Sequence, residues 1–178
     1  MYTVRDGSTY GQLPVPSKSG YEFVGWKDEN DNTIYSGSTV RSETEKLTAK
    51  YSQRLWANIY AKINDCDNES LVGIGRADLY KNGALYRSNE SGLQWISGIE
   101  GDTFRIDNFQ ILDTFKCVRV EASKNCNVDF ENGTLKSIEF TMTADGSQDV
   151  TLYFESNSPL QTIINSVGAD TVVFDSDI

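Results

Sequence analysis

The chain has 178 residues and a net charge of −10; 38% of its residues are hydrophobic and 24% are charged, which is the composition of a folded globular protein. It contains no histidine, which excludes Ser-His-Asp and Cys-His catalytic systems and histidine-ligated zinc sites. It has no run of about 18 apolar residues and no cluster of basic residues, so we expect no direct membrane insertion and no nucleic-acid binding.

The first part of the chain, residues 1–52, reads as a small aromatic module. We expect its core to contain the aromatic and aliphatic residues Leu13, Tyr21, Phe23, Val24 and Trp26. A module of about 50 residues is only marginally stable by itself. The predicted elements are a strand at residues 2–5, an extended segment at 13–16, an aromatic cluster at 20–26 and a closing strand at 47–51.

Three motifs in this part resemble the internalin-type B repeat, also called the Listeria-Bacteroides repeat. They are Tyr10-Gly11-x-Leu13-Pro14-x-Pro16, Gly20-Tyr21-x-Phe23-x-Gly25-Trp26 and Leu47-Thr48-Ala49-Lys50-Tyr51. The resemblance covers residues 2–51 and implies a small β-grasp-like module of a bacterial surface protein. The family usually opens with a longer strand and a Gly-Gly turn and closes with Trp, whereas this chain closes with Tyr51. We therefore expect the chain to be a piece of a longer exported protein, with its signal and anchor outside these residues.

The second part, residues 53–178, alternates apolar and polar residues over several long stretches that are rich in β-branched and aromatic residues, which predicts strands. Turn signals recur roughly every ten residues. Asn82-Gly83 and Asn132-Gly133 predict type I′ hairpin turns. Residues 158–167 are compatible with a helix or with extended structure. The whole chain is thus predicted to be all-β: a β-grasp-like repeat followed by an immunoglobulin-like or transthyretin-like β-sandwich.

Two of the predicted strands have one clearly apolar face. In residues 55–63 this face consists of Leu55, Ala57, Ile59, Ala61 and Ile63, opposite a face with Trp56, Tyr60 and Lys62. In residues 150–155 the apolar face consists of Val150, Leu152 and Phe154, opposite Thr151, Tyr153 and Glu155.

Residues 57–126 also resemble, more distantly, the collagen-adhesin B-type domain, a transthyretin-like module. The similar segments are Lys62-Ile63-Asn64-Asp65, Leu71-Val72-Gly73, Asp78-Leu79-Tyr80 and Val118-Arg119-Val120-Glu121. The resemblance implies an isopeptide bond between Lys62 and Asn157, assisted by a buried Glu121. We do not expect this bond, because the alternation places Asn157 on the polar face of its strand.

Metal and disulfide chemistry have few candidates. Asp65, Asp67 and Glu69 alternate in one loop, as calcium ligands often do, but a solvated turn explains them equally, and we expect no cofactor. Cys66 and Cys126 lie in loop-like sequence and could pair, which would leave Cys117 as a buried thiol.

The sequence therefore favours a module without enzymatic activity, displayed outside the cell and attached to the cell surface or wall, that serves in adhesion, docking or as a stalk segment. Its partner would be a surface protein or a glycan of the host or of a bacterium. The alternative is a carbohydrate-binding module that accompanies a secreted enzyme, in which Trp95 stacks on a sugar ring and Tyr80 and Tyr86 flank it. In a β-sandwich, however, Trp95 could equally be a core residue packed between the sheets.

Overall fold

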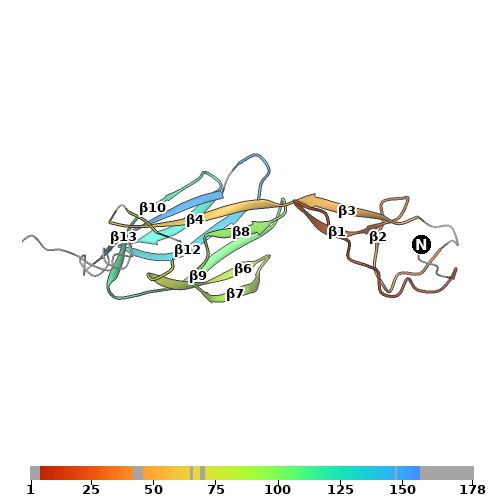
Figure 1. Cartoon of the computed structure of the whole chain (residues 1–178), viewed down its shortest axis with the longest axis horizontal. Helices are drawn as coiled ribbons and strands as arrows, with labels where there is room; N and C mark the ends of the chain where they lie inside the picture. Colours follow the sequence, from red (N-terminus) through yellow and green to blue (C-terminus); the bar gives the residue numbers. More distant parts are fainter. Residues whose placement is uncertain (1–4, 42–45, 65, 69–70, 147, 157–178) are drawn as a thin grey trace, which may run out of the picture. The chain divides into compact units, whose positions relative to one another are not determined.

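The computed structural model describes residues 5–41, 46–64, 66–68, 71–146 and 148–156, and only the backbone of Cys66 and Asn68. These residues form strands and turns, with no helix among them, and the predicted all-β fold class is confirmed. The chain divides into two compact units, Met1–Arg54 and Leu55–Ile178, here called unit 1 and unit 2. Figure 1 labels most of the strands of both, and each unit is described by itself. The predicted segment 158–167 lies outside the described residues.

Unit 1 contains a three-stranded antiparallel sheet in the order β2-β1-β3. Its strands are β1 (Tyr21–Lys27), β2 (Thr33–Ile34) and β3 (Thr48–Gln53). A β-bulge interrupts the pairing of β1 with β3 between Phe23 and Gly25, where Gly25 has a φ of 145°. The extra residue at the bulge places Phe23 and Trp26 on one face of the sheet, although they are three positions apart.

The aromatic residues of this face pack edge to face. The ring of Phe23 lies 5.7 Å from that of Trp26 and 5.9 Å from that of Tyr51, at interplanar angles of 65° and 69°. The indole Nε1 of Trp26 also donates a hydrogen bond of 2.8 Å to the carbonyl oxygen of Pro14. This bond ties the extended segment before the sheet to the aromatic cluster.

The predicted core of unit 1 is partly wrong. Tyr21 and Val24 are 37% and 47% exposed, whereas Tyr10 and Val40, which were not among the predicted core residues, are only 4% and 2% exposed. Val24 directly follows Phe23 in β1, so its side chain points away from the face that Phe23 occupies. The position of Trp26 is what alternation cannot anticipate, because only the bulge returns it to the face of Phe23.

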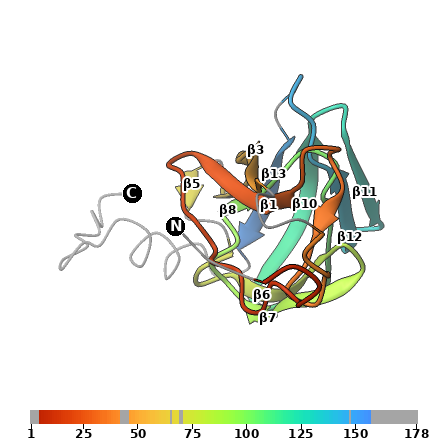
Figure 2. The ribbon, with the colours of Figure 1, turned by 90° about the vertical axis from the view of Figure 1, so that its right-hand side faces the viewer.

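Unit 2 is a β-sandwich of two sheets, as predicted for residues 53–178. In the first, called the β4 sheet, the order is β10-β13-β4, and both β5 and β8 pair with the remaining edge of β4; in the second, called the β9 sheet, the order is β11-β12-β9-β6-β7. In Figure 2, β10 and β11 lie toward one side of the sandwich and β5 and β8 toward the other. The strands are β4 (Leu55–Ile63), β5 (Cys66–Asn68), β6 (Gly75–Lys81), β7 (Ala84–Glu90), β8 (Trp95–Gly98), β9 (Thr103–Ile111), β10 (Phe115–Ala122), β11 (Cys126–Glu131), β12 (Thr134–Thr141) and β13 (Gln148–Ser156).

The core of unit 2 lies between these sheets and follows the alternation of the strands. From the β4 sheet it receives the predicted apolar faces of β4 and β13, which are buried except for the half-buried Leu55. The β9 sheet contributes buried residues of β6, β9 and β12. The strands β4 and β13 run parallel, with Ala57–Ile63 opposite Gln148–Phe154. The buried residues include Ala57, Ile59, Ala61, Ile63, Leu79, Phe104, Ile106, Ile138, Phe140, Val150, Leu152 and Phe154.

Both predicted hairpin turns are confirmed. Asn82 and Gly83 connect β6 to β7 with φ values of 52° and 79°, and Asn132 and Gly133 connect β11 to β12 with φ values of 52° and 78°. Positive φ at both central residues is the mark of a type I′ turn, which suits the twist of the flanking strands.

One buried carboxylate fixes the loop between β8 and β9 to the turn after β6. Asp102 accepts hydrogen bonds from the backbone N–H of Ile99 (2.9 Å) and from Asn82 Nδ2 (2.8 Å), and it forms an ion pair of 2.8 Å with Lys81 Nζ. The Lys81 and Asp102 side chains are only 21% and 10% exposed. Burial alone would raise the pKa of Asp102, but the hydrogen bonds outweigh it and hold the pKa below its ordinary value.

Candidate functional site

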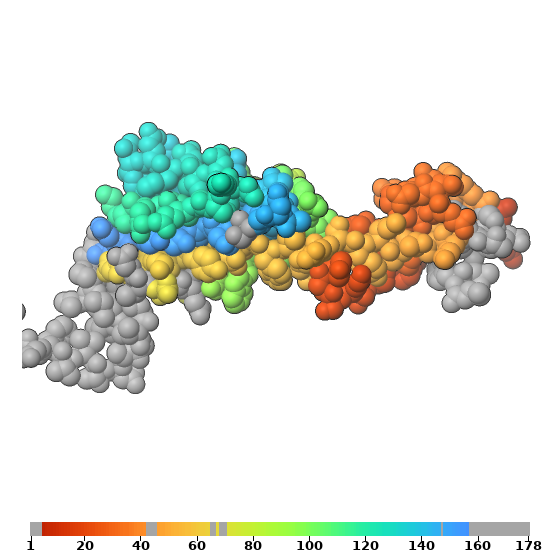
Figure 3. All heavy atoms as spheres, turned by 90° about the horizontal axis from the view of Figure 1, so that it is seen from above, coloured from red at the N-terminus to blue at the C-terminus, as the bar shows by residue number. Residues whose placement is uncertain are grey.

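The outer face of the β4 sheet exposes three large aromatic side chains, which we call the aromatic patch. Trp56, Tyr60 and Trp95 are 54%, 39% and 64% exposed. Exposed aromatic residues that gather on one face commonly mark a binding surface. Figure 3 looks onto this side of unit 2, where β10, β13 and β4 run side by side in teal, blue and yellow.

Strand register brings the three aromatic residues together. Trp56 and Tyr60 are outward-facing residues of β4 on either side of Asn58, and the antiparallel pairing of β8 with β4 sets Trp95 directly opposite Asn58. Outward residues two apart on a strand lie roughly 7 Å apart, and neighbouring strands about 4.8 Å apart, so all three aromatic residues surround Asn58.

The centre of the aromatic patch is polar. Asn58 Nδ2 donates a hydrogen bond of 2.7 Å to Asp149 Oδ1, and the register of β4 with β13 sets these two residues side by side. The amide of Asn58 has a second N–H and an acceptor oxygen, and a carboxylate accepts several hydrogen bonds, so the pair can both donate to and accept from a ligand. The backbone N–H of Asp149 is itself bound by Ser123 Oγ at 3.1 Å, which helps to fix its position.

Charged residues occupy the adjoining part of the same face. Lys62 forms an ion pair of 3.1 Å with Asp67. The guanidinium of Arg119 lies 3.6 Å from the ring centre of Tyr153, and the Tyr153 hydroxyl donates a hydrogen bond of 2.7 Å to Glu121. That hydrogen bond raises the pKa of Tyr153. The five side chains form a connected polar surface next to the aromatic patch.

Two of the three residues named for an isopeptide bond lie on this outer face. Lys62 points to the outer face and pairs with Asp67, Glu121 is exposed on the same face, and Asn157 lies outside the described residues. The chemistry implied by the resemblance requires a buried carboxyl group, so the exposure of Glu121 speaks against it.

The sugar-binding residues named from the sequence are separated by the fold. Trp95 is exposed on β8, so the interpretation of this residue as a core Trp between the sheets is wrong. Tyr80 and Tyr86 belong to β6 and β7 of the other sheet and do not flank it. Tyr86 is 58% exposed, while Tyr80 lines a hollow of about 940 Å³ over the β9 sheet together with Arg105.

The sequence did not single out Trp56, Asn58, Tyr60 and Asp149 as site residues. A signal for two of them was present, because Trp56 and Tyr60 lie on the polar face of a strand whose other face is entirely apolar. Aromatic residues on such a face have no core to enter. Their meeting with Trp95 depends on the pairing of strands that are distant in sequence, for which no local pattern exists.

The calcium candidates are not assembled into a site by the described residues. Asp67 pairs with Lys62, and Asp65 and Glu69 lie outside the described part of the chain. Within the described residues, no group of three or more acidic or cysteine side chains is placed to hold a metal ion.

The described cysteines are free thiols. Cys117 is buried in the core, and burial raises its pKa to about 11; Cys126 is half-buried, and burial likewise raises its pKa. A raised pKa keeps a thiol protonated and unreactive at neutral pH. The side chain of Cys66 lies outside the described residues.

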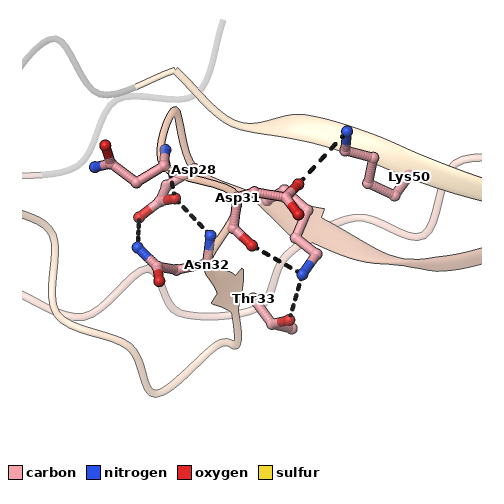
Figure 4. Close-up of polar contacts among 7 residues, drawn as sticks. Asp28, Asp31, Asn32, Thr33 and Lys50 are labelled. Atoms are coloured by element: carbon pink, nitrogen blue, oxygen red, sulfur yellow. Dashed lines mark hydrogen bonds and ion pairs between the residues drawn. The ribbon is translucent and has the colours of Figure 1, made fainter.

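In unit 1, an acidic turn between β1 and β2 is held by its own hydrogen bonds (Figure 4). The carboxylate of Asp28 accepts bonds from the backbone N–H groups of Asn30 and Asn32 and from Asn32 Nδ2, at 2.8–2.9 Å. The Asn32 side chain contributes most to lowering the pKa of Asp28. Lys27 Nζ binds the backbone oxygen of Asp31, and Lys50 Nζ forms an ion pair with its carboxylate. These oxygen atoms are therefore engaged in contacts within unit 1.

Unit 1 has a hollow of about 660 Å³ beside Trp26. It is lined by Leu13, Pro14, Val24 and Tyr35, among others. Trp26 is half-buried there and already uses its N–H to bind Pro14. Packing within unit 1 therefore accounts for this residue.

The comparisons with known proteins found no relative. No protein-family model, no curated protein and no solved structure matches the chain. The resemblances to the internalin-type B repeat and to the collagen-adhesin domain therefore stay predictions. Among the described residues, no helix is long and apolar enough to cross a membrane.

Proposed function

We propose that this chain is a module without catalytic activity, displayed on a bacterial cell surface, and that it binds its partner through the outer face of the β4 sheet in unit 2. The observation that carries the proposal is the aromatic patch, because Trp56, Tyr60 and Trp95 expose their rings on one face. Aromatic residues of this kind supply much of the binding energy at recognition surfaces.

Two properties of the sequence support a binding role without catalysis. The chain has no histidine, which removes the commonest general base of enzymes, and its acidic surface suits a soluble exported module. The motifs that resemble the B repeat support display at the cell surface, and this step rests on analogy.

The experiment that tests this proposal measures saturable binding of the fluorescently labelled chain to intact host cells and to bacterial envelopes. The double variant Trp56→Ala/Trp95→Ala should lose most of the binding. The matched control, Leu85→Ala/Tyr86→Ala, removes two residues that are 56% and 58% exposed on the other sheet, and it should bind like the unmodified chain. Equal binding by both double variants would place the contact elsewhere and refute the proposal.

A further inference from the structure

We propose that the aromatic patch, together with the pair of Asn58 and Asp149 at its centre, is a binding site for a neutral polysaccharide. The inference rests on the proposed function and names the class of ligand. Each pyranose ring has a face of C–H bonds that stacks on an aromatic ring and a rim of hydroxyl groups that donate and accept hydrogen bonds. The aromatic rings of the patch match the C–H face of a sugar, and the Asn58–Asp149 pair matches its hydroxyl groups.

The spacing of the aromatic residues suits a chain of sugars. Trp56 and Tyr60 lie on one strand on either side of Asn58, and Trp95 faces Asn58 from the next strand. Strand geometry therefore places Trp56 and Tyr60 about 14 Å apart, with Trp95 about 8 Å from each, a span that a chain of a few pyranose rings covers. Because all three are held on paired strands of one sheet, the platform exists before the ligand arrives and little conformational entropy is lost on binding.

The polar centre of the aromatic patch would orient a bound sugar through hydrogen bonds. Asn58 and Asp149 are joined by a hydrogen bond of 2.7 Å and lie next to the exposed rings. Their remaining donor and acceptor capacity can bind the hydroxyl groups of a sugar that stacks on either Trp. A purely apolar patch would offer nothing to the hydroxyl rim, and a purely polar one nothing to the C–H face.

The charge of the surface favours a neutral chain over an anionic one. Asp149 is the charged residue within the site, and the nearest lysine on β4, Lys62, is engaged by Asp67. The chain as a whole carries a charge of −10. An anionic polysaccharide would meet repulsion at each repeat unit, without a cluster of cations to offset it.

The shape of the surface favours a polysaccharide over a protein partner. Trp56 and Tyr60 lie on β4, which is paired with β13 on one edge and with β8 and β5 on the other, so an extended peptide cannot add to β4 as a further strand. Stable protein interfaces also bury about 800 Å² per partner. Three exposed aromatic side chains form a smaller surface, which matches a few sugar rings.

Affinity gel electrophoresis of the full chain tests the inference. The native gels contain a soluble neutral polysaccharide, in turn a mixed-linkage β-glucan, a xylan and a mannan, and polygalacturonate serves as the anionic probe. We expect at least one neutral polysaccharide to retard the chain and polygalacturonate to leave it unretarded. Trp95→Ala should weaken the affinity roughly tenfold or more, and Asn58→Ala should weaken it as well.

Controls separate the loss of a contact from the loss of the fold. Tyr86→Ala removes an aromatic residue of similar exposure from the other sheet and should leave retardation unchanged. The melting temperature of Trp95→Ala should equal that of the unmodified chain, because the side chain is 64% exposed. Should Trp95→Ala be unstable, Trp56→Ala provides the same test from the neighbouring strand.

The outcomes distinguish this inference from the proposed function. Retardation by none of the neutral polysaccharides, or retardation that Trp95→Ala and Trp56→Ala leave unchanged, overturns the polysaccharide site. If cell binding still depends on the aromatic patch and is abolished by protease treatment of the cells, the partner is a protein: the proposed function then stands and the polysaccharide inference fails.

Discussion

Replacement of Asp102 by Ala should destabilise unit 2 strongly, since it removes the centre of a buried polar cluster. The carboxylate binds Lys81, Asn82 and the backbone N–H of Ile99 at 2.8–2.9 Å, and both charged side chains are at most 21% exposed. Removal of one partner from a buried ion pair typically costs about 3–5 kcal/mol, because the charge left behind has lost its counterpart in a poorly solvated place. This is a large fraction of the roughly 5–15 kcal/mol that stabilises a domain.

The assay is urea unfolding of the full chain followed by tryptophan fluorescence in a Trp26→Phe background, so that the signal comes from Trp56 and Trp95 in unit 2. With a typical m-value of about 2 kcal/mol/M, the midpoint should fall by roughly 2 M while the m-value stays the same. The matched control is Glu131→Ala. Glu131 also lies 2.8 Å from its partner, Lys136, but these side chains are 65% and 50% exposed.

The comparison of Asp102→Ala with Glu131→Ala tests how burial affects the contribution of an ion pair to stability. The exposed pair with Glu131 should contribute at most about 1 kcal/mol, because water screens it. Equal shifts in midpoint for Asp102→Ala and Glu131→Ala would show that burial does not govern the cost, and the reasoning would be refuted.

The same carboxylate predicts a dependence on pH. The pKa of Asp102 in the folded chain lies below its ordinary value of 3.8. Such a group binds protons more weakly when folded than when unfolded, so its contribution to stability is complete above about pH 5 and is lost as the pH falls through the folded pKa. Between pH 5 and pH 2, the urea midpoint should therefore fall less steeply in Asp102→Asn than in the unmodified chain.

Further predictions concern packing and thiol reactivity. Gly75→Ala should destabilise unit 2 by roughly 1–3 kcal/mol or more in urea unfolding, because a Cβ there would lie 2.5 Å from the backbone oxygen of Gln110; Gly92→Ala, with open space around it, should change stability by less than about 1 kcal/mol. Trp26→Ala should cost roughly 2 kcal/mol, below the ~3–5 kcal/mol of a fully buried Trp, and a thermal melt should lose the transition of unit 1 alone. Cys117, with a pKa of about 11, should resist maleimide at pH 8 until urea unfolds the chain, and peptide mapping by mass spectrometry would show its labelling.

The fold of unit 2 was largely accessible from the sequence because its signals are local. Leu152 and Phe154 are buried and Thr151 faces outward, as the period of two requires. Asn82-Gly83 forms the expected turn because few other residue pairs tolerate two positive φ angles in succession. In unit 1 alternation fails at Trp26, which shares a face with Phe23 although the two are three positions apart, because a bulge shifts the register by one residue.

The candidate site was less accessible because strand pairing over long distances creates it. Trp95 was recognised as a residue of interest, but the tyrosines proposed beside it belong to the other sheet. Its actual neighbours, Trp56 and Tyr60, precede it by more than thirty residues in the sequence, and Asp149 follows it by more than fifty. Only the order of strands in the β4 sheet brings these positions together.

The parallel pairing of β4 with β13 also determines how unit 2 responds to force. Because the two strands run in the same direction, the start of β4 and the end of β13 lie at opposite ends of the pair. Tension applied between Leu55 and Ser156 would therefore act along the strands and shear them past each other. The hydrogen bonds between Ala57–Ile63 and Gln148–Phe154 would share this load at the same time, whereas a hairpin pulled open from its ends loses its bonds one after another.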